Sequence, residues 1–284
     1  MADPVRLTGL RAIAHQYDAI LCDVWGVLHD GLTVHPGVVE ALTEFQARAP
    51  VVLITNAPRP AQPVVKQLEG LGVPRSAYSD IVSSGDVIRQ HLIDNDTRAV
   101  FHIGPDRDLP LYVGTNAEVV DRLDEAEVVV AAGLRDDYTE TADDYADELA
   151  AMLPLGLPFM CANPDIVVER GGELVPCAGA LAQAYENIGG TVVHFGKPHA
   201  PIYQTAIARA RALAPDASRI LAVGDALNTD ITGANTHGFD SLFITGGIHK
   251  EHLGDHADPD HEKVARFVSN AGLCVEHYTP RLVW

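Results

Sequence analysis

The sequence predicts an α/β protein that contains a parallel sheet, with a second, smaller α/β block inserted into it. Short apolar runs of strand length alternate with helical patterns of about 10–15 residues, which is typical of parallel strands joined by crossover helices. The alternation breaks near Asn95 and then resumes with strands and helices of its own. We therefore expect residues 1–95 and 191–284 to form a core domain and residues 96–190 to form an inserted domain.

Composition and charge argue against several classes of partner. The 284 residues are 47% hydrophobic, which is enough for a full core. The net charge of −19 argues against binding to nucleic acid, which requires clustered Lys and Arg, and against binding to an anionic membrane surface. No apolar run approaches the roughly 18 residues of a membrane span, and no secretory signal is visible. These features predict a cytoplasmic protein.

The cysteines show no CxxC spacing and stand in apolar or strand-like contexts. We expect them to be small buried hydrophobic side chains rather than disulfides or metal ligands. They are Cys22, Cys161, Cys177 and Cys274.

In the first third of the chain, three apolar runs predict strands, each followed by a helical pattern. The run from Ala19 to Cys22 is typical of a strand buried on both faces, and it ends at Asp23. Gly26 then allows a sharp turn. In order, we expect a short amphipathic helix at 3–16, strands at 19–23, 51–55 and 80–83, and helices at 36–45, 60–71 and 85–93.

The remainder of the chain continues the alternation, and the tail from Gly246 is less regular. Within the inserted block we expect strands at 99–103, 128–132 and 158–161, helices at 141–152 and 178–188, and a hairpin around Gly171-Gly172. After it, we expect strands at 192–195, 219–223 and 241–244 and helices at 201–213 and 229–237.

Polar residues follow four of the predicted strands directly. They are Asp23, the pair Thr55-Asn56, Lys197 and Asp225, and Asp230 comes five residues after Asp225. The carboxyl ends of parallel strands share one edge of a sheet, so these side chains should converge there. Carboxylates suit Mg²⁺, whereas a hydroxyl, amides and a lysine suit a phosphate. The edge is therefore expected to bind a metal ion and a phosphate group.

These motifs resemble those of the haloacid dehalogenase superfamily of phosphotransferases, and most of all its class IIA branch of pyridoxal phosphate phosphatase and nitrophenylphosphatase-like enzymes. The resemblance extends from about Asp18 to about Gly247. The matching segments are Asp23-Val24-Trp25-Gly26-Val27-Leu28, Thr55-Asn56-Ala57-Pro58-Arg59, Gly196-Lys197-Pro198 and Gly224-Asp225-Ala226-Leu227-Asn228-Thr229-Asp230, with Ala162-Asn163-Pro164-Asp165 and Pro176-Cys177-Ala178-Gly179-Ala180 in the inserted block.

The resemblance implies a Rossmann-like parallel-sheet core with an inserted α/β cap of the C2 type. It implies that Asp23 attacks phosphorus and forms an aspartyl-phosphate. Thr55 and Asn56 would hold the phosphoryl group. Lys197 would bridge the nucleophile and the phosphate.

The metal implied by the resemblance is Mg²⁺. Asp23, Asp225 and the backbone carbonyl of Trp25 would ligate it, and Asp230 and Asn228 would support the ligands from close by. The implied function is that of a Mg²⁺-dependent phosphatase for a small phosphorylated metabolite, such as a sugar phosphate. The cap would close over the substrate and set specificity. Pairing through the caps makes a homodimer one possible assembly.

Trp25 departs from the pattern of the superfamily. Most of its phosphatases carry a second Asp at this position, which protonates the leaving oxygen and then activates water. An indole can do neither, and such help is typically worth about 10²–10⁴-fold in rate. The metal site is less affected, because position 25 contributes only its backbone carbonyl.

Three interpretations of Trp25 remain open, and a packing role for its ring under the cap is compatible with each. The protein is a phosphatase for a substrate with a good leaving group, or one that recruits another acid, His29 and Asp30 being nearest in sequence. It catalyses another reaction, although the cap lysine of carbon–phosphorus bond-cleaving members has no match here. Or it is a low-activity or inactive protein that binds a phosphate ligand or acts in regulation.

Two other groups of polar residues are candidates for a functional site. His249, His252, His256 and His261, interleaved with acids, fit no standard zinc spacing, and a solvated acidic loop is the favoured interpretation. Arg135-Asp136-Asp137-Tyr138 follows a strand of the inserted block and either faces the site or forms a turn.

Overall fold

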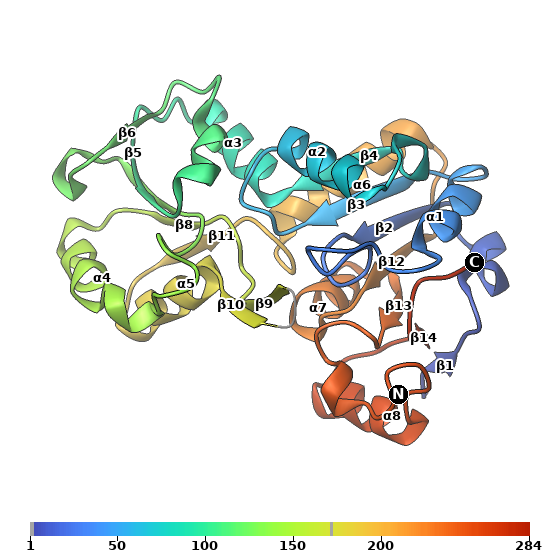
Figure 1. The fold of residues 1–284 in the computed structure, drawn as a ribbon. Helices are drawn as coiled ribbons and strands as arrows, with labels where there is room; N and C mark the ends of the chain where they lie inside the picture. The colour runs from blue at the N-terminus through green and yellow to red at the C-terminus, as the bar shows by residue number, and fades with distance from the viewer. Residues whose placement is uncertain (1–2, 171–172) are drawn as a thin grey trace.

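The computed structural model describes residues 3–170 and 173–284, and it contains two parallel sheets that lie side by side (Figure 1). The larger sheet has seven strands in the order β1-β14-β13-β12-β2-β3-β4. All its neighbouring pairs are parallel. Its strands are β1 (Val5–Arg6), β2 (Ala19–Asp23), β3 (Val51–Thr55), β4 (Asp80–Ser83), β12 (Ile220–Gly224), β13 (Asp240–Ile244) and β14 (His277–Thr279).

The smaller sheet has five parallel strands in the order β11-β8-β7-β5-β6. A separate antiparallel hairpin, β9 with β10, extends from it toward the larger sheet (Figure 1). These strands are β5 (Ala99–Ile103), β6 (Glu118–Val120), β7 (Val128–Ala131), β8 (Phe159–Cys161), β9 (Val167–Arg170), β10 (Glu173–Pro176) and β11 (Val192–His194). The predicted fold class, a parallel α/β protein with a second α/β unit, is confirmed.

Helices cover both faces of the larger sheet. Ile20 and Leu53 face one way and pack with Leu42 and Phe45 of α1, whereas their neighbours in the strands face the other way and pack with α3 and α6. This alternation follows from the two-residue repeat of a strand and explains why β2 and β3 are apolar almost throughout. The helices are α1 (Val38–Gln46), α2 (Ala61–Leu71), α3 (Ser84–Asp94), α6 (Ala200–Leu213), α7 (Thr232–His237) and α8 (His261–Asn270).

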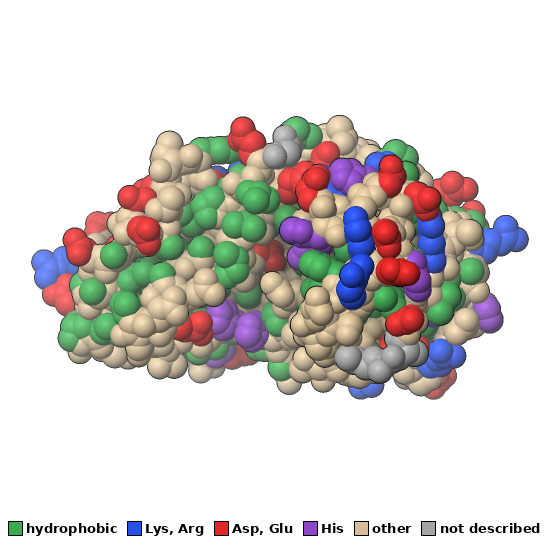
Figure 2. Space-filling view, turned by 90° about the horizontal axis from the view of Figure 1, so that it is seen from below, with side chains coloured by type: hydrophobic (Ala, Val, Ile, Leu, Met, Phe, Trp, Pro, Cys, Tyr) green, Lys and Arg blue, Asp and Glu red, His purple; other side chains and the backbone are tan. Residues whose placement is uncertain are grey.

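The smaller sheet shares a hydrophobic cluster with the larger one. On one face it packs against α4 (Ala146–Met152) and α5 (Ala178–Asn187). Its other face contributes Val100 and Val130 to the cluster that also contains Ile88 and Leu92 of α3. The two sheets are therefore joined by a continuous apolar contact. Figure 2 shows hydrophobic side chains gathered over the part of the surface that belongs to the smaller sheet.

The ends of the chain differ from the prediction. Instead of a helix, the segment at 3–16 contains β1 and two short 3₁₀ turns, Leu10–Ala12 and Ala14–Gln16. The cause is a long-range pairing, since Val5 pairs with His277 of β14 at the other end of the chain. The tail, expected to be irregular, supplies both α8 and β14. The short edge strand β6 was also not predicted.

The strand at Val192–His194 lies in the smaller sheet, not in the larger one as we expected. It pairs with β8 at the edge of that sheet, and it is only partly buried. A short apolar run has the same appearance in either sheet, so the pattern could not decide between them. As a consequence, Lys197 reaches the larger sheet from a loop between the two sheets.

Two further predictions concern single residue types. The hairpin glycines at 171–172 lie outside the described residues, but the flanking strands pair antiparallel, with Arg170 opposite Glu173. Cys22, Cys161 and Cys177 are buried as expected, whereas Cys274 is exposed, so that the prediction was wrong for this last cysteine.

Within the described residues, no helix is both long enough and apolar enough to cross a membrane.

The end of α2 offers a matched test of the fold. Gly70 lies inside the helix with open space around its Cα, whereas Gly72 ends the helix in the left-handed region with φ of +95°. Gly70→Ala should raise the free energy of unfolding by about 0.5–1 kcal/mol, because alanine favours the helix. Gly72→Ala should lower it by about 1–2 kcal/mol, because a Cβ is strained in the left-handed region. Urea unfolding followed by circular dichroism measures both, and equal effects would contradict the described helix end.

Candidate active site

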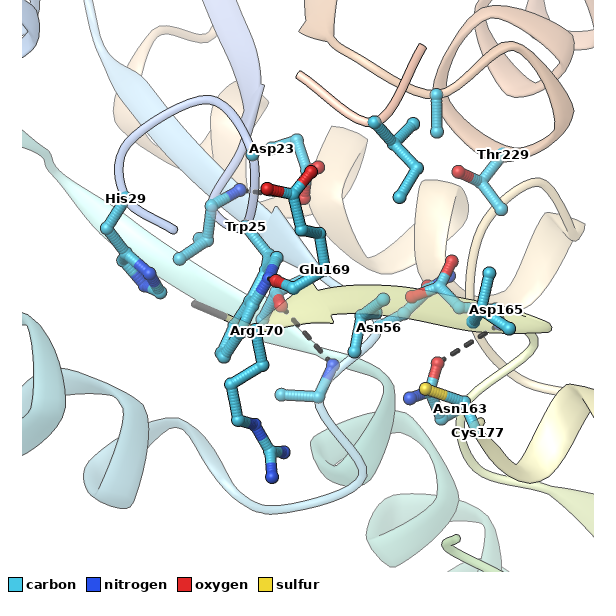
Figure 3. A pocket seen from close by; sticks show the side chains of 18 of the residues that line it. Asp23, Trp25, His29, Asn56, Asn163, Asp165, Glu169, Arg170, Cys177 and Thr229 are labelled. Carbon is cyan, nitrogen blue, oxygen red and sulfur yellow. Dashed lines mark hydrogen bonds between the residues drawn. The ribbon is translucent and has the colours of Figure 1, made fainter. Parts of the chain in front are cut away.

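A cavity of about 160 Å³ opens between the carboxyl ends of the central strands and the loops of the smaller sheet (Figure 3). Asp23 ends β2, Thr55 ends β3 and Asp225 follows β12. The parallel register places Cys22 opposite both Leu53 and Val223, so these ends lie at one edge. The hairpin β9–β10 and the loop around Asp165 supply the opposite wall.

Lys197 is buried between two carboxylates in this cavity. Its Nζ lies 2.6 Å from Asp23 Oδ1 and 2.7 Å from Asp230 Oδ1, and its side chain is 2% exposed. Burial by itself lowers the pKa of Lys197, but Asp23 and Asp230 outweigh it and hold the pKa well above the usual value. The ammonium group is therefore a fixed positive charge beside Asp23.

Asp23 and Asp225 are both buried acids with raised pKa values. Burial is the main cause for each, and the charge of Asp230 adds to it. The pKa of Asp225 rises to about 7. Carboxylate oxygens of Asp23, Asp225 and Asp230 lie within 4.8 Å of one another, which is the only group of this kind that the described residues form. Three buried carboxylates beside one ammonium favour a further cation.

Two glycines make room for the Asp225 carboxylate. A Cβ at Gly26 or at Gly247 would overlap this carboxylate, and Gly26 adopts φ of +81°, where other residues are strained. The Asp225 carboxylate also accepts a hydrogen bond from Ile248 N at 2.7 Å. The turn after β2 and the loop near residue 247 thus fix the orientation of this acid.

Asn56 acts as a brace around Lys197. Its Oδ1 accepts from Lys197 N at 2.6 Å, and its Nδ2 donates to Asp165 Oδ1 at 3.0 Å and to Lys197 O at 3.2 Å. Both amide hydrogens are thereby used. The phosphate contact expected of Asn56 stays a prediction, and with the side chain engaged in this way the backbone N–H is the group that would make it. Thr55 is buried, lines the cavity and accepts from Ala57 N at 3.3 Å through Oγ1.

Trp25 connects the turn after β2 to the β9–β10 hairpin. Its indole N–H donates to the backbone oxygen of Glu169 on β9 at 2.7 Å, and its ring packs edge-on against His29 with centroids 5.0 Å apart (Figure 3). Lys250 forms an ion pair with the side chain of the same Glu169 at 2.6 Å. The residue in place of the usual acid therefore holds the hairpin against the turn that follows Asp23.

The acids nearest to Trp25 in sequence are poorly suited to replace a proton donor. His29 is almost fully buried, which lowers its pKa to about 4, and its Nδ1 accepts from Gly31 N at 2.9 Å. Asp30 accepts from the backbone of Leu32 and Thr33 within its own turn. Although burial opposes them, these hydrogen bonds lower the pKa of Asp30. His29 is thus neutral and Asp30 ionised near neutral pH.

Some predicted residues lie elsewhere. Asn228, expected beside the metal ligands, is exposed and does not line the cavity, whereas its neighbour Thr229 is buried and does. This difference arises in a π-helical turn, Leu227–Ile231, in which Leu227, Thr229, Asp230 and Ile231 are buried and Asn228 is exposed. Asp230 remains inside, where its carboxylate also accepts from Ala226 N at 3.1 Å.

The histidine-rich segment shows no shared site. His249 accepts from Leu227 N at 3.2 Å, and burial lowers its pKa to about 4. His252 stacks on Phe267, and His261 contacts the hydroxyl of Tyr278 at 3.0 Å. His249 also packs against the ring of Phe267, so these histidines all take part in structural contacts.

Several residues of the cavity were not predicted from the sequence. Arg59 was noted only as part of a motif, whereas Arg107 and Asp108 lie in a 3₁₀ helix and Arg170 at the end of β9, where a charge is usually solvated. Of the segment 135–138, Asp137 lines the cavity while Arg135 pairs with Glu148 at 2.7 Å.

The sequence and the fold of this chain are similar to those of known proteins. The model of the family described as haloacid dehalogenase-like hydrolase matches residues 20–130, and a second, HAD-hydrolase-like model matches residues 194–271. A haloacid dehalogenase-like hydrolase from Brucella suis is 43% identical, with a TM-score of 0.81, and the alignment covers 90% of this chain and 95% of that one.

Other similar proteins are phosphatases by name. A D-glycerol 3-phosphate phosphatase of Mycobacterium tuberculosis is 28% identical over 88% of this chain and 69% of its own length. The structure of a glycerol phosphate phosphatase from that organism, solved in complex with magnesium, is 25% identical in sequence and has a TM-score of 0.67. The alignment covers 89% of this chain and 78% of that chain.

The class IIA fold is also shared. A p-nitrophenyl phosphatase from Archaeoglobus fulgidus has a TM-score of 0.70 at 19% identity and covers 92% of this chain and 95% of its own. The resemblance inferred from four strand ends is therefore confirmed, and this chain belongs to the haloacid dehalogenase-like hydrolase family, with the fold of its class IIA members.

Proposed function

We propose that the protein is a magnesium-dependent phosphatase for a small phosphorylated metabolite and that Asp23 is its nucleophile. The observation that carries the proposal is the buried contact of Asp23 with Lys197, next to the carboxylates of Asp225 and Asp230. This arrangement provides an oxygen nucleophile, a fixed positive charge and oxygen ligands within one cavity.

Magnesium fits the donor set. The donors are carboxylate oxygens, and Mg²⁺ prefers one or two protein carboxylates together with water and phosphate oxygens. Asp23 and Asp225, with the backbone carbonyl of Trp25, would hold the ion, and Asp230 would orient Lys197. When bound, the ion would neutralise charge on the transferred phosphoryl group. The magnesium complex of the mycobacterial phosphatase supports this assignment.

The protein's own residues support each part of the transfer. The Val24 N–H, at 2.7 Å, and Lys197 hold Asp23 Oδ1, and none of the described residues donates to its other oxygen. A carboxylate oxygen of Asp23 attacks phosphorus while the bond from phosphorus to the ester oxygen breaks, and water later cleaves the aspartyl-phosphate. Thr55, the backbone after it and Lys197 bind the phosphate oxygens.

The leaving oxygen needs a proton that position 25 cannot supply. Asp165 lies in the cavity wall, and burial raises its pKa to about 6. Asp165 is therefore partly protonated near neutral pH, and it fits the role of acid better than His29 or Asp30 does.

The smaller sheet would act as the cap. The inserted segment around it, through the loop at Asp165 and through Glu169 and Arg170 of β9, lines the wall opposite Asp23, so it would contact the part of the substrate beyond the phosphate. The core and cap would thus divide as residues 1–95 with 191–284 and residues 96–190, except that β11 belongs with the cap sheet. The names of the relatives favour glycerol or sugar phosphates as substrates.

A second candidate function is supported by Trp25 itself. Because its indole donates to Glu169, Trp25 serves to hold the hairpin and not to transfer protons. A protein that binds a phosphate ligand with little turnover is consistent with this contact. Thermal stabilisation by a phosphorylated metabolite that is not consumed would favour this alternative.

Asp23→Asn tests the nucleophile. Release of inorganic phosphate from p-nitrophenyl phosphate with Mg²⁺ should fall at least about 10³-fold, because an amide cannot form the aspartyl-phosphate. Asp216→Asn, an exposed acid outside the cavity, serves as the control and should retain activity. Unchanged turnover in a folded Asp23→Asn protein would rule out this role.

Trp25→Asp tests whether a missing acid limits the rate. The substitution should raise kcat on alkyl phosphates by about 10-fold or more, since general acid–base help is worth about 10²–10⁴-fold. Trp25→Asn also removes the contact with Glu169 but cannot titrate, so it isolates the effect of the lost indole. Equal rates for the two variants would show that protonation is not limiting.

A further inference from the structure

A cluster of five charged side chains lies in the same cavity as Asp23 and Lys197. Arg59 comes from the loop after β3 of the larger sheet. The other four come from the inserted segment, residues 96–190: Arg107 and Asp108 lie in a 3₁₀ helix (Asp106–Tyr112), Asp137 in the loop after β7 and Arg170 on β9. Three guanidinium groups thus face two carboxylates. None of these five side chains has a part in the phosphoryl transfer described above.

Arg107 and Arg170, the two arginines of the cluster that come from the inserted segment, share one carboxylate. Arg107 and Arg170 both pair with Asp137 Oδ2, the latter at 3.4 Å, and Asp137 is only 7% exposed. Arg170 also donates to the hydroxyl of Tyr138 at 3.1 Å. One carboxylate balances only one of the two positive charges, so this pair retains a net positive charge.

Arg59 and Asp108 lie close to each other but are not hydrogen-bonded. Arg59 Nε is 3.8 Å from Asp108 Oδ1, which is too long for a hydrogen bond. Both atoms are buried, and neither has a hydrogen-bond partner among the described residues. The Arg59 side chain is nevertheless 26% exposed and lines the cavity, so the accessible part of its guanidinium group faces any ligand bound there.

The backbone of Arg59 is held rigidly. A Cβ at Gly85 would overlap the backbone of Arg59, and Gly85 N donates to Ala57 O at 3.1 Å. Asp86, in the first turn of α3, accepts from Ala61 N at 3.1 Å. The guanidinium therefore projects from a fixed loop, four residues after Thr55. Such a preorganised donor loses little entropy when it binds a ligand.

Charge balance indicates what the cluster would bind. Three carboxylates, Lys197 and a magnesium ion sum to zero charge even before a phosphate binds, so with the phosphate in place that centre would repel a second anion. The five-residue cluster, in contrast, carries one excess positive charge within a protein of net charge −19. Arginine binds planar carboxylates through two parallel hydrogen bonds. The cavity of about 160 Å³ limits the ligand to a small molecule.

We propose that Arg59, Arg107 and Arg170 form a carboxylate subsite and that the substrate is a small hydroxy acid phosphorylated on its hydroxyl group. This inference rests on the proposed phosphatase function. It adds that one end of the substrate binds at Asp23 and the other at the arginines. The relatives' names mention glycerol and sugar phosphates, which lack this carboxylate.

Two probes that differ only at the proposed contact test the inference. 3-Phosphoglycerate carries a carboxylate where glycerol 3-phosphate carries a CH₂OH group. Calorimetric titration of the full-length Asp23→Asn protein with Mg²⁺ measures binding without turnover. We expect 3-phosphoglycerate to bind at least about tenfold more tightly, as a charge-assisted pair of hydrogen bonds would require.

Substitution of the arginines should remove this preference. Arg59→Gln and Arg170→Gln, each in the Asp23→Asn background, should bring the ratio of the two Kd values close to one. Arg122→Gln is the control, because Arg122 belongs to the inserted segment as well but pairs with Asp124 on the surface. Circular dichroism verifies folding, and Arg107→Gln replaces either variant that fails to fold.

The outcomes separate the subsite from the phosphatase function. A Kd ratio near one in the Asp23→Asn protein, or a ratio that persists in two arginine variants, overturns the subsite. A preference that depends on the arginines supports it, even where wild-type protein hydrolyses neither compound, in which case the proposed phosphatase function fails instead. Equal kcat/KM of the wild-type protein for the two compounds, with measurable turnover, also overturns the subsite and leaves the phosphatase function standing.

Discussion

The buried ammonium of Lys197, between Asp23 and Asp230, is the interaction on which the rest of the site depends. Without it, three carboxylates would lie together in a region from which water is largely excluded, and their mutual repulsion would be uncompensated. Removing one partner of a buried charge pair typically costs about 3–5 kcal/mol, because the other charge is left unpaired. Lys197 thus contributes to the stability of the strand ends, in addition to the phosphate binding that we propose for it.

Lys197 in turn depends on contacts that cross between the two sheets. It enters from the loop after β11, a strand of the smaller sheet, and Asn56 at the end of β3 holds its backbone on both sides. The same amide holds Asp165 of the opposite wall. A change in the relative position of the sheets would therefore move the lysine, the amide and the wall of the cavity together.

Much of the fold could be predicted from the sequence, and physical reasons explain which elements were predicted correctly and which were not. The central strands are predictable because burial on both faces demands an unbroken apolar run, and a polar residue ends it at Asp23 and Thr55. The sheet to which Val192–His194 belongs was not predictable, because the partner of a short strand is chosen by contacts distant in sequence. The tail contained an overlooked signal, since Val264 and Val268 are spaced as on one face of a helix.

The candidate site shows the same contrast. The convergence of Asp23, Lys197, Asp225 and Asp230 follows from strand polarity together with the resemblance, because each is close to a strand end. The role of Asn56 as a brace and the arginine cluster depend on which loops face each other. A charged residue looks the same in a sequence whether water or a cavity surrounds it, so Arg107 in its 3₁₀ helix and Arg170 at the end of β9 could not be singled out from the sequence.

The indole of Trp25 gives the molecule an optical property. The chain has only two tryptophans, Trp25 and Trp284, and Trp284 packs against the apolar cluster of the larger sheet, away from the hairpin. Trp25 alone is hydrogen-bonded across the cavity, to the backbone of Glu169. Separation of the hairpin from the larger sheet would expose its N–H to water and shift its emission to longer wavelength. The intrinsic fluorescence of the protein would therefore report any movement of the hairpin away from the larger sheet in real time, with no attached dye.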